Sequence, residues 1–292
     1  MRFGLAGTGY WAQIAHAPAL AATDGIEFAA VWGRNPDSAA KLAAQHGAVA
    51  YDDVDAFLDD VDAVAFAVPP DVQAVIAEHA ASRGKHLLLE KPVALTGPAA
   101  DALAGAVDRA GVASVVFFTA RFRPQVRDWL ADVAARSGWL GGTAVWRGGA
   151  LTESNPFNTP WRREHGGLWD VGPHAVSLLW ASLGPVTSVT ADAGLADITH
   201  LILHHEGGVT STVTVTCSAP ESAVANECYL WGEPGTSTLP TGTYDTVDAL
   251  RTALTELAAN ARSGQVTHPC DVRFGAAVTH VLASAQQQLR RG

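Results

Sequence analysis

The sequence predicts an α/β protein: a doubly wound parallel sheet in the N-terminal part, followed by an α+β domain with a largely antiparallel open sheet. Three observations support this prediction. Almost continuously apolar strands alternate with helical patterns over residues 1–118, as in a parallel sheet covered on both faces. A glycine-rich turn follows the first strand. Beyond residue 119, strand patterns follow one another through short turns, which is typical of antiparallel pairing. We therefore expect domains at 1–118 and 119–292.

The elements of the first domain follow from apolar runs and their end signals. Residues 2–6 form the first strand, and residues 26–32 form the second. Asn35 as N-cap and Pro36 as the first helical residue begin a helix that stops at Gly47. The other expected elements are a strand at 62–68 closed by Pro69-Pro70, a helix at 72–81, a strand at 87–89, a helix at 98–110 and a strand at 113–118.

The second domain is expected to contain four strands after a long stretch, residues 148–167, that is rich in Gly, Asn and Pro. Glu206-Gly207-Gly208 is a hairpin turn signal between two of these strands. The expected elements are a helix at 124–135, a strand at 143–147, a helix ending at Leu183, strands at 186–191, 198–204, 209–218 and 226–232, and helices at about 246–262 and 272–289.

Composition excludes several functions. The chain has 292 residues with a formal charge of -10, so nucleic acid and anionic membrane surfaces are not expected partners. The expected partner is a small molecule. No signal segment and no run of about 18 apolar residues is found. Three cysteines form neither an even disulfide set nor a metal-binding pair, so we expect no metal and a reducing, cytoplasmic location.

A dinucleotide-binding turn is predicted at Gly7-Thr8-Gly9-Tyr10-Trp11-Ala12, between the first strand and a helix. In a Rossmann fold the first glycine permits the tight turn and the second lets a pyrophosphate approach the backbone, while a small residue at the third position keeps the helix close. The helix N-terminus supplies the anion site. The alternative is a turn without a ligand. We expect Gly7, Thr8, Gly9, Tyr10, Trp11 and Ala12 to contact the cofactor.

The end of the second strand predicts NADP in preference to NAD. An acid that would bind a ribose hydroxyl is missing there, because the sequence reads Trp32-Gly33-Arg34-Asn35. Arg34 could instead pair with a 2′-phosphate and stack on the adenine, with Gly33 beside it. The alternative is that Arg34 is an ordinary solvated charge.

Lys91 is a candidate active-site residue because it follows an apolar strand, in the run Glu90-Lys91-Pro92. Only three lysines occur in the chain, against 16 arginines. Ligands of open parallel sheets bind outside the carboxyl ends of the strands. The alternative is a strand-end ammonium that extends into water.

Asp170 and His174 form a second candidate pair, in the run Gly166-Gly167-Leu168-Trp169-Asp170-Val171-Gly172-Pro173-His174. Helical spacing places the two side chains one turn apart on one face. Pro173 belongs in the first turn of a helix, so the helix should begin near residues 169–171. The alternatives are that Asp170 is its N-cap and that His174 is a hydrogen-bonded core histidine.

The order of these motifs closely resembles the Gfo/Idh/MocA family of NAD(P)-dependent enzymes, the glucose-fructose oxidoreductase and inositol dehydrogenase type, over nearly the whole chain. Pro69-Pro70 and Arg121-Phe122-Arg123-Pro124 resemble further family features. The resemblance implies that Lys91, Asp170 and His174 form the active site, and that the C-terminal sheet mediates a homodimer or homotetramer. It also implies cofactor contacts by Pro69, Pro70, Glu90, Lys91 and Arg121.

The chain departs from the family pattern at Ser177, where many relatives carry another acid three residues after the histidine. Polyol recognition is therefore expected to differ. The candidates to line the substrate pocket precede the Asp170 helix, with loop surface as the alternative; they are Asn158, Trp161, Arg162 and His165.

The expected function is hydride transfer between nicotinamide and a secondary alcohol or carbonyl of a sugar, cyclitol or related molecule. His174 would be the general base, Asp170 would orient it, and Lys91 would hydrogen-bond the developing alkoxide. Two alternatives remain: an enzyme that acts on a non-sugar substrate or uses its nicotinamide only transiently, and a regulator that senses NAD(P) without turnover. The joint presence of the three residues favours an enzyme, because sensing requires none of them.

Overall fold

The computed structural model describes residues 1–291, which form two compact units. Unit 1 consists of Met1–Phe122 and Tyr244–Ala277, and unit 2 consists of Arg123–Thr243 and the end of the chain from Val278. The expected division into consecutive domains, 1–118 and 119–292, therefore differs from the structure in its second part. The segment from Tyr244 returns to unit 1 because its helix α9 buries Leu250, Leu254 and Leu257 there.

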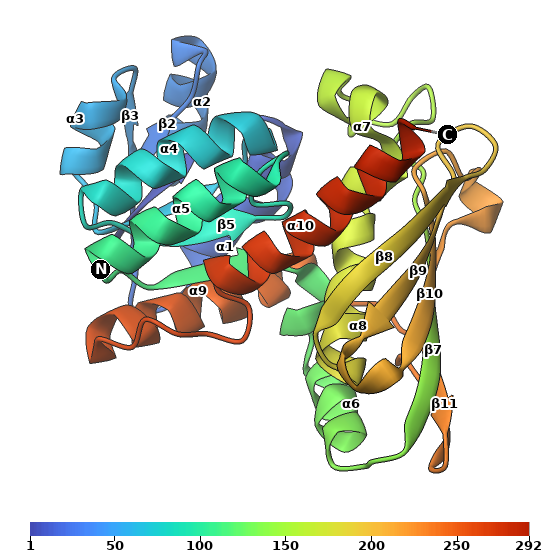
Figure 1. Ribbon diagram of the computed structural model, residues 1–292. Coiled ribbons are helices and arrows are strands. Elements are labelled where there is room, and N and C mark those ends of the chain that lie inside the picture. Colours follow the sequence, from blue (N-terminus) through green and yellow to red (C-terminus); the bar gives the residue numbers. More distant parts are fainter. Residues whose placement is uncertain (292) are drawn as a thin grey trace. The chain divides into compact units, whose positions relative to one another are not determined.

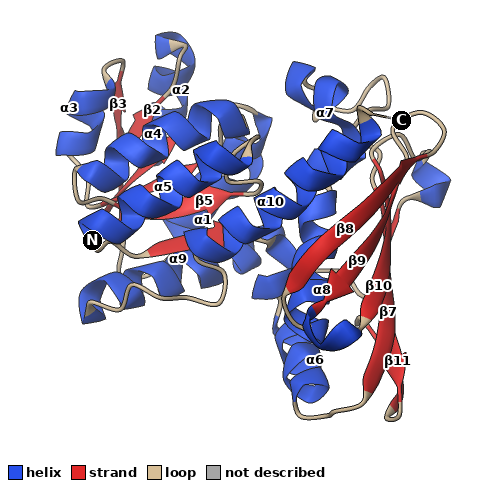
Figure 2. Cartoon of the chain, viewed as in Figure 1, coloured by secondary structure: helices blue, strands red, loops and turns tan. Residues whose placement is uncertain are grey.

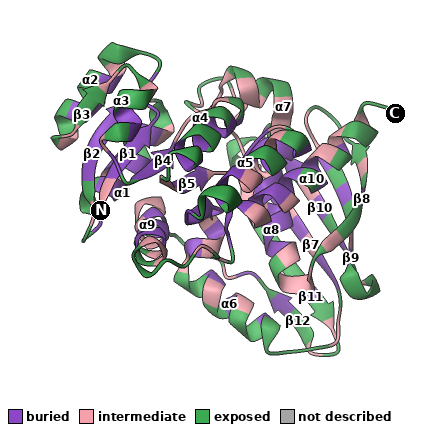
Figure 3. Ribbon diagram, turned by 60° about the vertical axis from the view of Figure 1, so that its left-hand side comes forward, coloured by how far each residue is buried: buried purple, intermediate pink, exposed green. Residues whose placement is uncertain are grey.

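Unit 1 is built on a six-stranded sheet in the order β3-β2-β1-β4-β5-β6, in which every neighbouring pair is parallel. The predicted parallel sheet is thus confirmed. The inner strands β1, β4 and β5 are almost fully buried, and they are drawn in purple in Figure 3. The strands are β1 (Arg2–Ala6), β2 (Glu27–Trp32), β3 (Val49–Tyr51), β4 (Ala63–Phe66), β5 (His86–Glu90) and β6 (Ser114–Phe117).

Helices cover both faces of this sheet. Figure 1 shows α4 and α5 side by side over β5, whereas α1 and α9 contact each other on the opposite face. The strand β3 and the helix α3 were not expected. The helices are the π-helical turn η1 (Ala12–His16), α1 (Ala17–Ala22), α2 (Pro36–His46), α3 (Val54–Asp59), α4 (Pro70–Ser82), α5 (Gly97–Ala110), the 3₁₀ turn η2 (Thr119–Phe122) and α9 (Thr246–Ser263).

The segment between α9 and α10 closes the β6 edge of the sheet. The backbone N–H of Val116 donates to the carbonyl oxygen of Cys270 at 2.6 Å, and the N–H of Val272 donates to the buried hydroxyl of Ser114 at 3.1 Å. An open edge would leave a row of unpaired backbone groups. The returning segment thereby becomes an integral part of unit 1.

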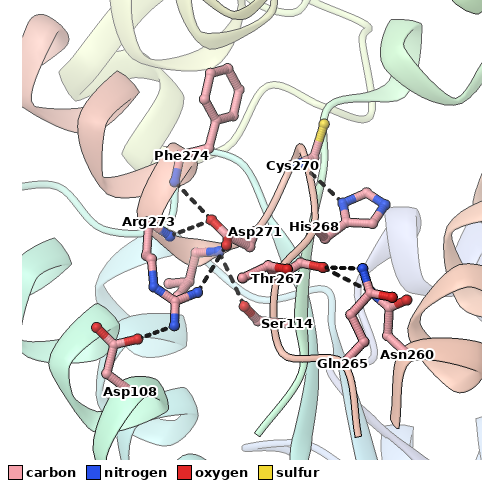
Figure 4. Close-up of polar contacts among 11 residues, drawn as sticks. Asp108, Ser114, Asn260, Gln265, Thr267, His268, Cys270, Asp271, Arg273 and Phe274 are labelled. Carbon is pink, nitrogen blue, oxygen red and sulfur yellow. Dashed lines mark hydrogen bonds and ion pairs between the residues drawn. The ribbon is translucent and has the colours of Figure 1, made fainter. Parts of the chain in front are cut away.

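Asp271 begins the helix α10 (Val272–Leu289), as Figure 4 shows. Its Oδ1 accepts hydrogen bonds from the backbone N–H groups of Arg273 and Phe274, each at 3.0 Å, which satisfies two donors of the first helical turn. The guanidinium of Arg273 pairs with Asp271 and also with Asp108 of α5. The first turn of α10 is thus fixed to unit 1, while its residues from Val278 belong to unit 2.

Unit 2 contains a second six-stranded sheet, in the order β12-β11-β7-β10-β9-β8. Only the pair β7 and β10 is parallel, so the predicted largely antiparallel sheet is confirmed. The strands, red in Figure 2, are β7 (Trp139–Arg147), β8 (Val186–Ala193), β9 (Thr199–His205), β10 (Thr210–Thr216), β11 (Ala225–Gly232) and β12 (Gly235–Thr238).

One face of this sheet carries helices, since α7 and α8 contact β10, α8 also contacts β7, and α6 packs on α8. The opposite face leaves the side chains of Ile202, Tyr229 and Trp231 exposed. No helix within residues 1–291 is long and apolar enough to cross a membrane. The other helices of unit 2 are α6 (Pro124–Ala134), α7 (Pro160–Asp170), α8 (Gly172–Leu183), and the 3₁₀ turns η3 (Glu206–Gly208) and η4 (Glu221–Ala223).

Candidate active site

The turn after β1 has the geometry of a dinucleotide cradle. Gly7 has φ of +132°, and a Cβ on it would lie 2.4 Å from the carbonyl oxygen of Ala67, so only glycine fits there. A Cβ on Gly9 would meet no atom within 4 Å, which leaves room for a ligand against its backbone. Ala12 is fully buried at the start of η1. The residues therefore fit a pyrophosphate at this turn.

The helix that follows the turn starts at Tyr10 and contains a π-helical turn from Ala12. The N–H of Ala17 bonds to the carbonyl oxygen of Ala12, five residues earlier, and Pro18 follows in the first turn of α1. A proline has no backbone N–H to donate, and π-helical geometry occurs mostly as single turns inside helices, as it does here. The sequence did not indicate this turn.

Lys91 follows β5 directly and is partly buried, at the carboxyl edge of the parallel sheet as predicted. The backbone on either side of it is held by Gln73 of α4, which is fully buried. The Gln73 amide accepts from the N–H of Glu90 and donates to the carbonyl oxygen of Glu90, each at 2.8 Å. It also lies 3.3 Å from the carbonyl oxygen of Pro92. Gln73 thus fixes the path of the chain around Lys91.

The Glu90 carboxylate contacts the helix of the glycine turn. Its Oε1 accepts from the indole N–H of Trp11 at 2.6 Å and lies 2.9 Å from Nε2 of the buried His16. This arrangement ties the end of β5 to η1. Glu90 and Trp11 were expected to contact the cofactor, and the structure adds a second role for both, which is to hold the glycine turn and the Lys91 segment together.

Arg34 stands at the end of β2 as expected. It is exposed, and within residues 1–291 its guanidinium makes no hydrogen bond or ion pair. Gly33 is buried, and a Cβ on it would lie 2.7 Å from the side chain of Thr8. Asn35 is used as the N-cap of α2, accepting from the N–H of Ser38 at 3.0 Å. The β2 end therefore offers a cation to a ligand and no carboxylate.

Three further residues expected near the cofactor lie in unit 1. Pro69 is the N-cap of α4 and Pro70 is its first residue, directly after β4. Arg121, in η2, has its guanidinium carbon 5.5 Å from the centre of the Phe274 ring. All three positions are compatible with the prediction, which stays a prediction.

In unit 2, Asp170 is the last residue of α7 and is not the N-cap of the next helix. Val171 takes the N-cap position of α8 without a side-chain cap, and Pro173 lies in its first turn. The expected helix start near residues 169–171 was therefore partly wrong. The reason is an additional helix: Thr159 and Pro160 begin α7, a start signal that the sequence interpretation overlooked.

Asp170 is buried and is contacted by two groups from different elements. Its Oδ2 lies 2.9 Å from Nε of Arg162, which is also a residue of α7. The two groups form an ion pair, but they are not aligned as a hydrogen bond. The same oxygen accepts from the thiol of Cys217 at 3.5 Å, just beyond β10. The Arg162 guanidinium lies over the rings of Phe157 and Trp161.

His174 lies in the first turn of α8, with its ring stacked on Trp146 of β7 at a centroid distance of 6.1 Å and an interplanar angle of 18°. Ser177, where the chain was expected to depart from the family pattern, is buried and donates to the carbonyl oxygen of His174 at 2.9 Å. Trp146, which contacts His174, lies near the end of β7, and Cys217, which contacts Asp170, follows β10. These two strands are neighbours in the sheet.

The other substrate candidates differ in how they are used. The side chain of Asn158 bonds within its own loop, to the carbonyl oxygens of Leu151 and Thr152 and to Arg163. Trp161 and His165 are partly exposed neighbours on α7, with ring centres 6.5 Å apart. Asn158 therefore supports the loop, while Trp161 and His165 remain candidates to contact a ligand.

Asp197, in the loop between β8 and β9, was not among the sequence candidates. Its Oδ2 accepts from the N–H groups of Gly167 at 2.8 Å and Cys217 at 2.7 Å, and its Oδ1 accepts from the hydroxyl of Thr216 at 2.6 Å. Burial acts to raise the pKa of Asp197, but these hydrogen bonds outweigh it and hold that pKa below its usual value. No local pattern marks this residue, because its partners lie 19 to 30 positions away in the sequence.

Comparison with known proteins agrees with the class defined by this fold and site, a dinucleotide-binding protein with a second, sheet-containing part. The family model described as "Oxidoreductase family, NAD-binding Rossmann fold" matches residues 1–118, and that of the "GFO/IDH/MocA C-terminal domain" matches residues 131–238. The chain belongs to the GFO/IDH/MocA family of oxidoreductases, as its motifs suggested.

Individual relatives are similar over different lengths. UDP-N-acetylglucosamine 3-dehydrogenase of Acidithiobacillus ferrooxidans is 34% identical over 127 residues, which is 44% of this chain and 40% of that protein. Oxidoreductase P35 of Formosa agariphila is 25% identical over 97% of both chains. The structure of levoglucosan dehydrogenase in complex with NADH and levoglucosan has a TM-score of 0.84 at 19% identity, covering 99% of this chain and 98% of that one. This last likeness concerns the fold.

Proposed function

We propose that the protein is an NAD(P)-dependent dehydrogenase that transfers hydride between nicotinamide and a secondary alcohol or carbonyl of a sugar, cyclitol or related molecule. The observation that carries the proposal is the position of Lys91 at the carboxyl edge of a parallel sheet whose glycine turn has the shape of a dinucleotide cradle. Relatives named as sugar and sugar-nucleotide dehydrogenases support the substrate class.

The cofactor would be held by the turn of Gly7 and Gly9 and by the N-terminus of η1, whose N–H groups favour anions. A bound nicotinamide supplies the redox chemistry, since it accepts or gives a hydride. Glu90 contacts Trp11 and His16 and so holds the segment of Lys91 in a fixed position next to this turn.

The remaining chemistry is proton transfer and charge stabilisation by the chain itself. His174 accepts the hydroxyl proton of the substrate, because a neutral imidazole is an effective base near neutral pH. Asp170, which Arg162 contacts at 2.9 Å, orients the imidazole and stabilises the resulting imidazolium. Lys91 hydrogen-bonds the substrate oxygen as negative charge develops on it. In the reverse direction the same groups reduce a carbonyl.

A screen tests this proposal. The purified protein is mixed with NAD⁺ or NADP⁺ and with cyclitols, aldoses, keto-sugars or nucleotide sugars, and near-ultraviolet absorbance reports reduced nicotinamide. The proposal expects turnover with at least one class. Tight cofactor binding without turnover on any class, unchanged in Lys91→Ala, would favour a regulator that only senses NAD(P).

Three finer assignments belong to the same proposal. NADP is preferred over NAD, because Arg34 is exposed at the end of β2 and no carboxylate stands there. The protein forms a homodimer or homotetramer through the outer face of the unit 2 sheet, where Ile202, Tyr229 and Trp231 are exposed. It works in the cytoplasm, a reducing compartment, because its three cysteines are buried thiols.

A further inference from the structure

One side chain of the loop between β8 and β9, that of Asp197, contacts the last turn of α7 at Gly167. We propose that Asp197 is a positioning residue that holds the catalytic carboxylate Asp170 in place, acting through Gly167 on one side and Cys217 on the other. This inference rests on the proposed function for the role of Asp170, but it concerns contacts that exist whatever the substrate is. Asp197 itself is not expected to touch substrate or cofactor.

The first route runs through the kink of α7. Gly166 has φ of +61°, and the helix resumes at Gly167, three residues before Asp170. A Cβ on Gly167 would lie 2.6 Å from the Cα of Thr216, so the helix backbone lies directly against the end of β10. The N–H of Gly167 donates to Asp197 at 2.8 Å. Asp197 thus fixes both the position and the direction of the final turn that carries Asp170.

The second route runs through the end of β10. The N–H of Cys217 donates to the same oxygen of Asp197 at 2.7 Å, and the hydroxyl of Thr216 donates to the other oxygen at 2.6 Å. The fully buried thiol of Cys217 in turn donates to Asp170 at 3.5 Å. A shift of Cys217 would therefore move the thiol that contacts Asp170.

The loop is shaped to present this carboxylate. Ala196, directly before it, has φ of +56°, a left-handed conformation that residues with a Cβ adopt at a cost. The three hydrogen bonds that Asp197 accepts supply the compensation. The lowered pKa of Asp197 agrees with a carboxylate that is stabilised in its charged form by these donors.

Asp197→Ala removes both acceptor oxygens and with them these three hydrogen bonds, and Asp192→Ala is the matched control. Asp192 is an exposed residue of the neighbouring strand whose carboxylate bonds only to the N–H of Ala193 among the described residues. We expect Asp197→Ala to lower kcat by about tenfold to a hundredfold, since small misplacements of catalytic groups have effects of this size. KM for the nicotinamide cofactor should change less than about twofold, because its cradle lies in unit 1.

A second readout does not depend on turnover. The infrared S–H stretching band of Cys217, identified by its loss in Cys217→Ala, reports the hydrogen bond from the thiol to Asp170. We expect the band to shift in Asp197→Ala, to stay in Asp192→Ala, and to return in Asp197→Asn, whose amide oxygen can accept from both backbone N–H groups. If Asp197→Ala does not fold, Thr216→Val removes one donor and should give a smaller shift in the same direction.

The outcomes separate the two proposals. A shifted band in a protein without oxidoreductase activity would refute the proposed function and leave the positioning of Asp170 standing. An unchanged band together with unchanged kcat would overturn the positioning role. A rise in the cofactor KM equal to the fall in kcat would also overturn it, because that pattern indicates general damage.

Discussion

At the scale of a single residue, Arg34 is the basis for expecting NADP in preference to NAD. Its exposed guanidinium is the only charged group directly after β2, so it is available to a 2′-phosphate. A hydrogen-bonded charge pair contributes about 1.5–3 kcal/mol, or roughly tenfold to a hundredfold in affinity. We expect Arg34→Ala to weaken NADPH binding by this factor in a fluorescence titration and to leave NADH within about twofold. Arg109→Ala, at the exposed end of α5, is the control. Equal affinities of the wild type for both cofactors would contradict the assignment.

Arg162 has two possible roles, a substrate contact as the sequence predicted and a partner of Asp170 as the structure shows. The sequence made it a substrate contact, whereas the structure pairs it with Asp170 and stacks it on Phe157 and Trp161. Lysine keeps the charge but cannot reproduce the planar stacking. We expect Arg162→Lys to lower kcat by about tenfold, and the neighbouring Arg163→Lys, whose guanidinium bonds to Asn158, to have little effect. Steady-state kinetics decide, since a rise in substrate KM with unchanged kcat would mean substrate binding instead.

The candidate site was predictable where chemistry is encoded in local motifs. Lys91 was predicted as a site residue from the run after an apolar strand; the structure places it directly after β5, and its role stays a prediction. Gln73 and Asp197 were missed because each acts on backbone groups that lie 17 to 30 residues away in the sequence. Such contacts exist only after the chain has folded, so a pattern of neighbouring residues cannot reveal them.

At the scale of elements, the glycine turn after β1 separates folding from binding. Alanine at Gly9 meets open space in this structure, so Gly9→Ala should fold like the wild type yet bind NADPH at least tenfold more weakly, because the methyl group enters the pyrophosphate space. Alanine at Gly7 would meet the backbone of Ala67 at positive φ, so Gly7→Ala should lower the melting temperature as well. Thermal unfolding and cofactor titration test the pair. Normal NADPH affinity in Gly9→Ala would contradict a cofactor at this turn.

Long apolar elements were predicted well, and short or polar ones were not. The strands of unit 1 other than β3 were identified from their apolar runs. β3 has three residues and exposes Val49, and α7 begins in a stretch whose Gly, Asn and Pro content suggested a loop. In these places the tertiary contacts, and not local propensity, determine the structure.

At the scale of the whole molecule, the outer face of the unit 2 sheet is the expected subunit interface. Trp231 covers Gly141 of the neighbouring strand, where a Cβ would lie 2.4 Å from its ring, and remains 39% exposed. Large exposed aromatic side chains commonly mark interaction surfaces. We expect Trp231→Glu to convert the assembly to monomers in sedimentation experiments, whereas Val75→Glu on α4 of unit 1 should not. A wild-type protein that stays monomeric at all concentrations would contradict this expectation.

Unit 1 is built from two segments that are far apart in the sequence, 1–122 and 244–277. The sequence predicted the start of a second domain at residue 119, and unit 2 of the structure begins at Arg123. The return of the segment 244–277 was not predictable, because it depends on the edge of β6 and on the buried Ser114 that receives it.

The most direct test of the central claim is the rate of nicotinamide reduction in Lys91→Met, measured in a single turnover with a substrate found by the screen. Methionine keeps the length of the side chain and removes the ammonium. We expect the rate to fall by about a hundredfold to a thousandfold, while the variant still binds the reduced cofactor. A rate equal to that of the wild type would contradict it.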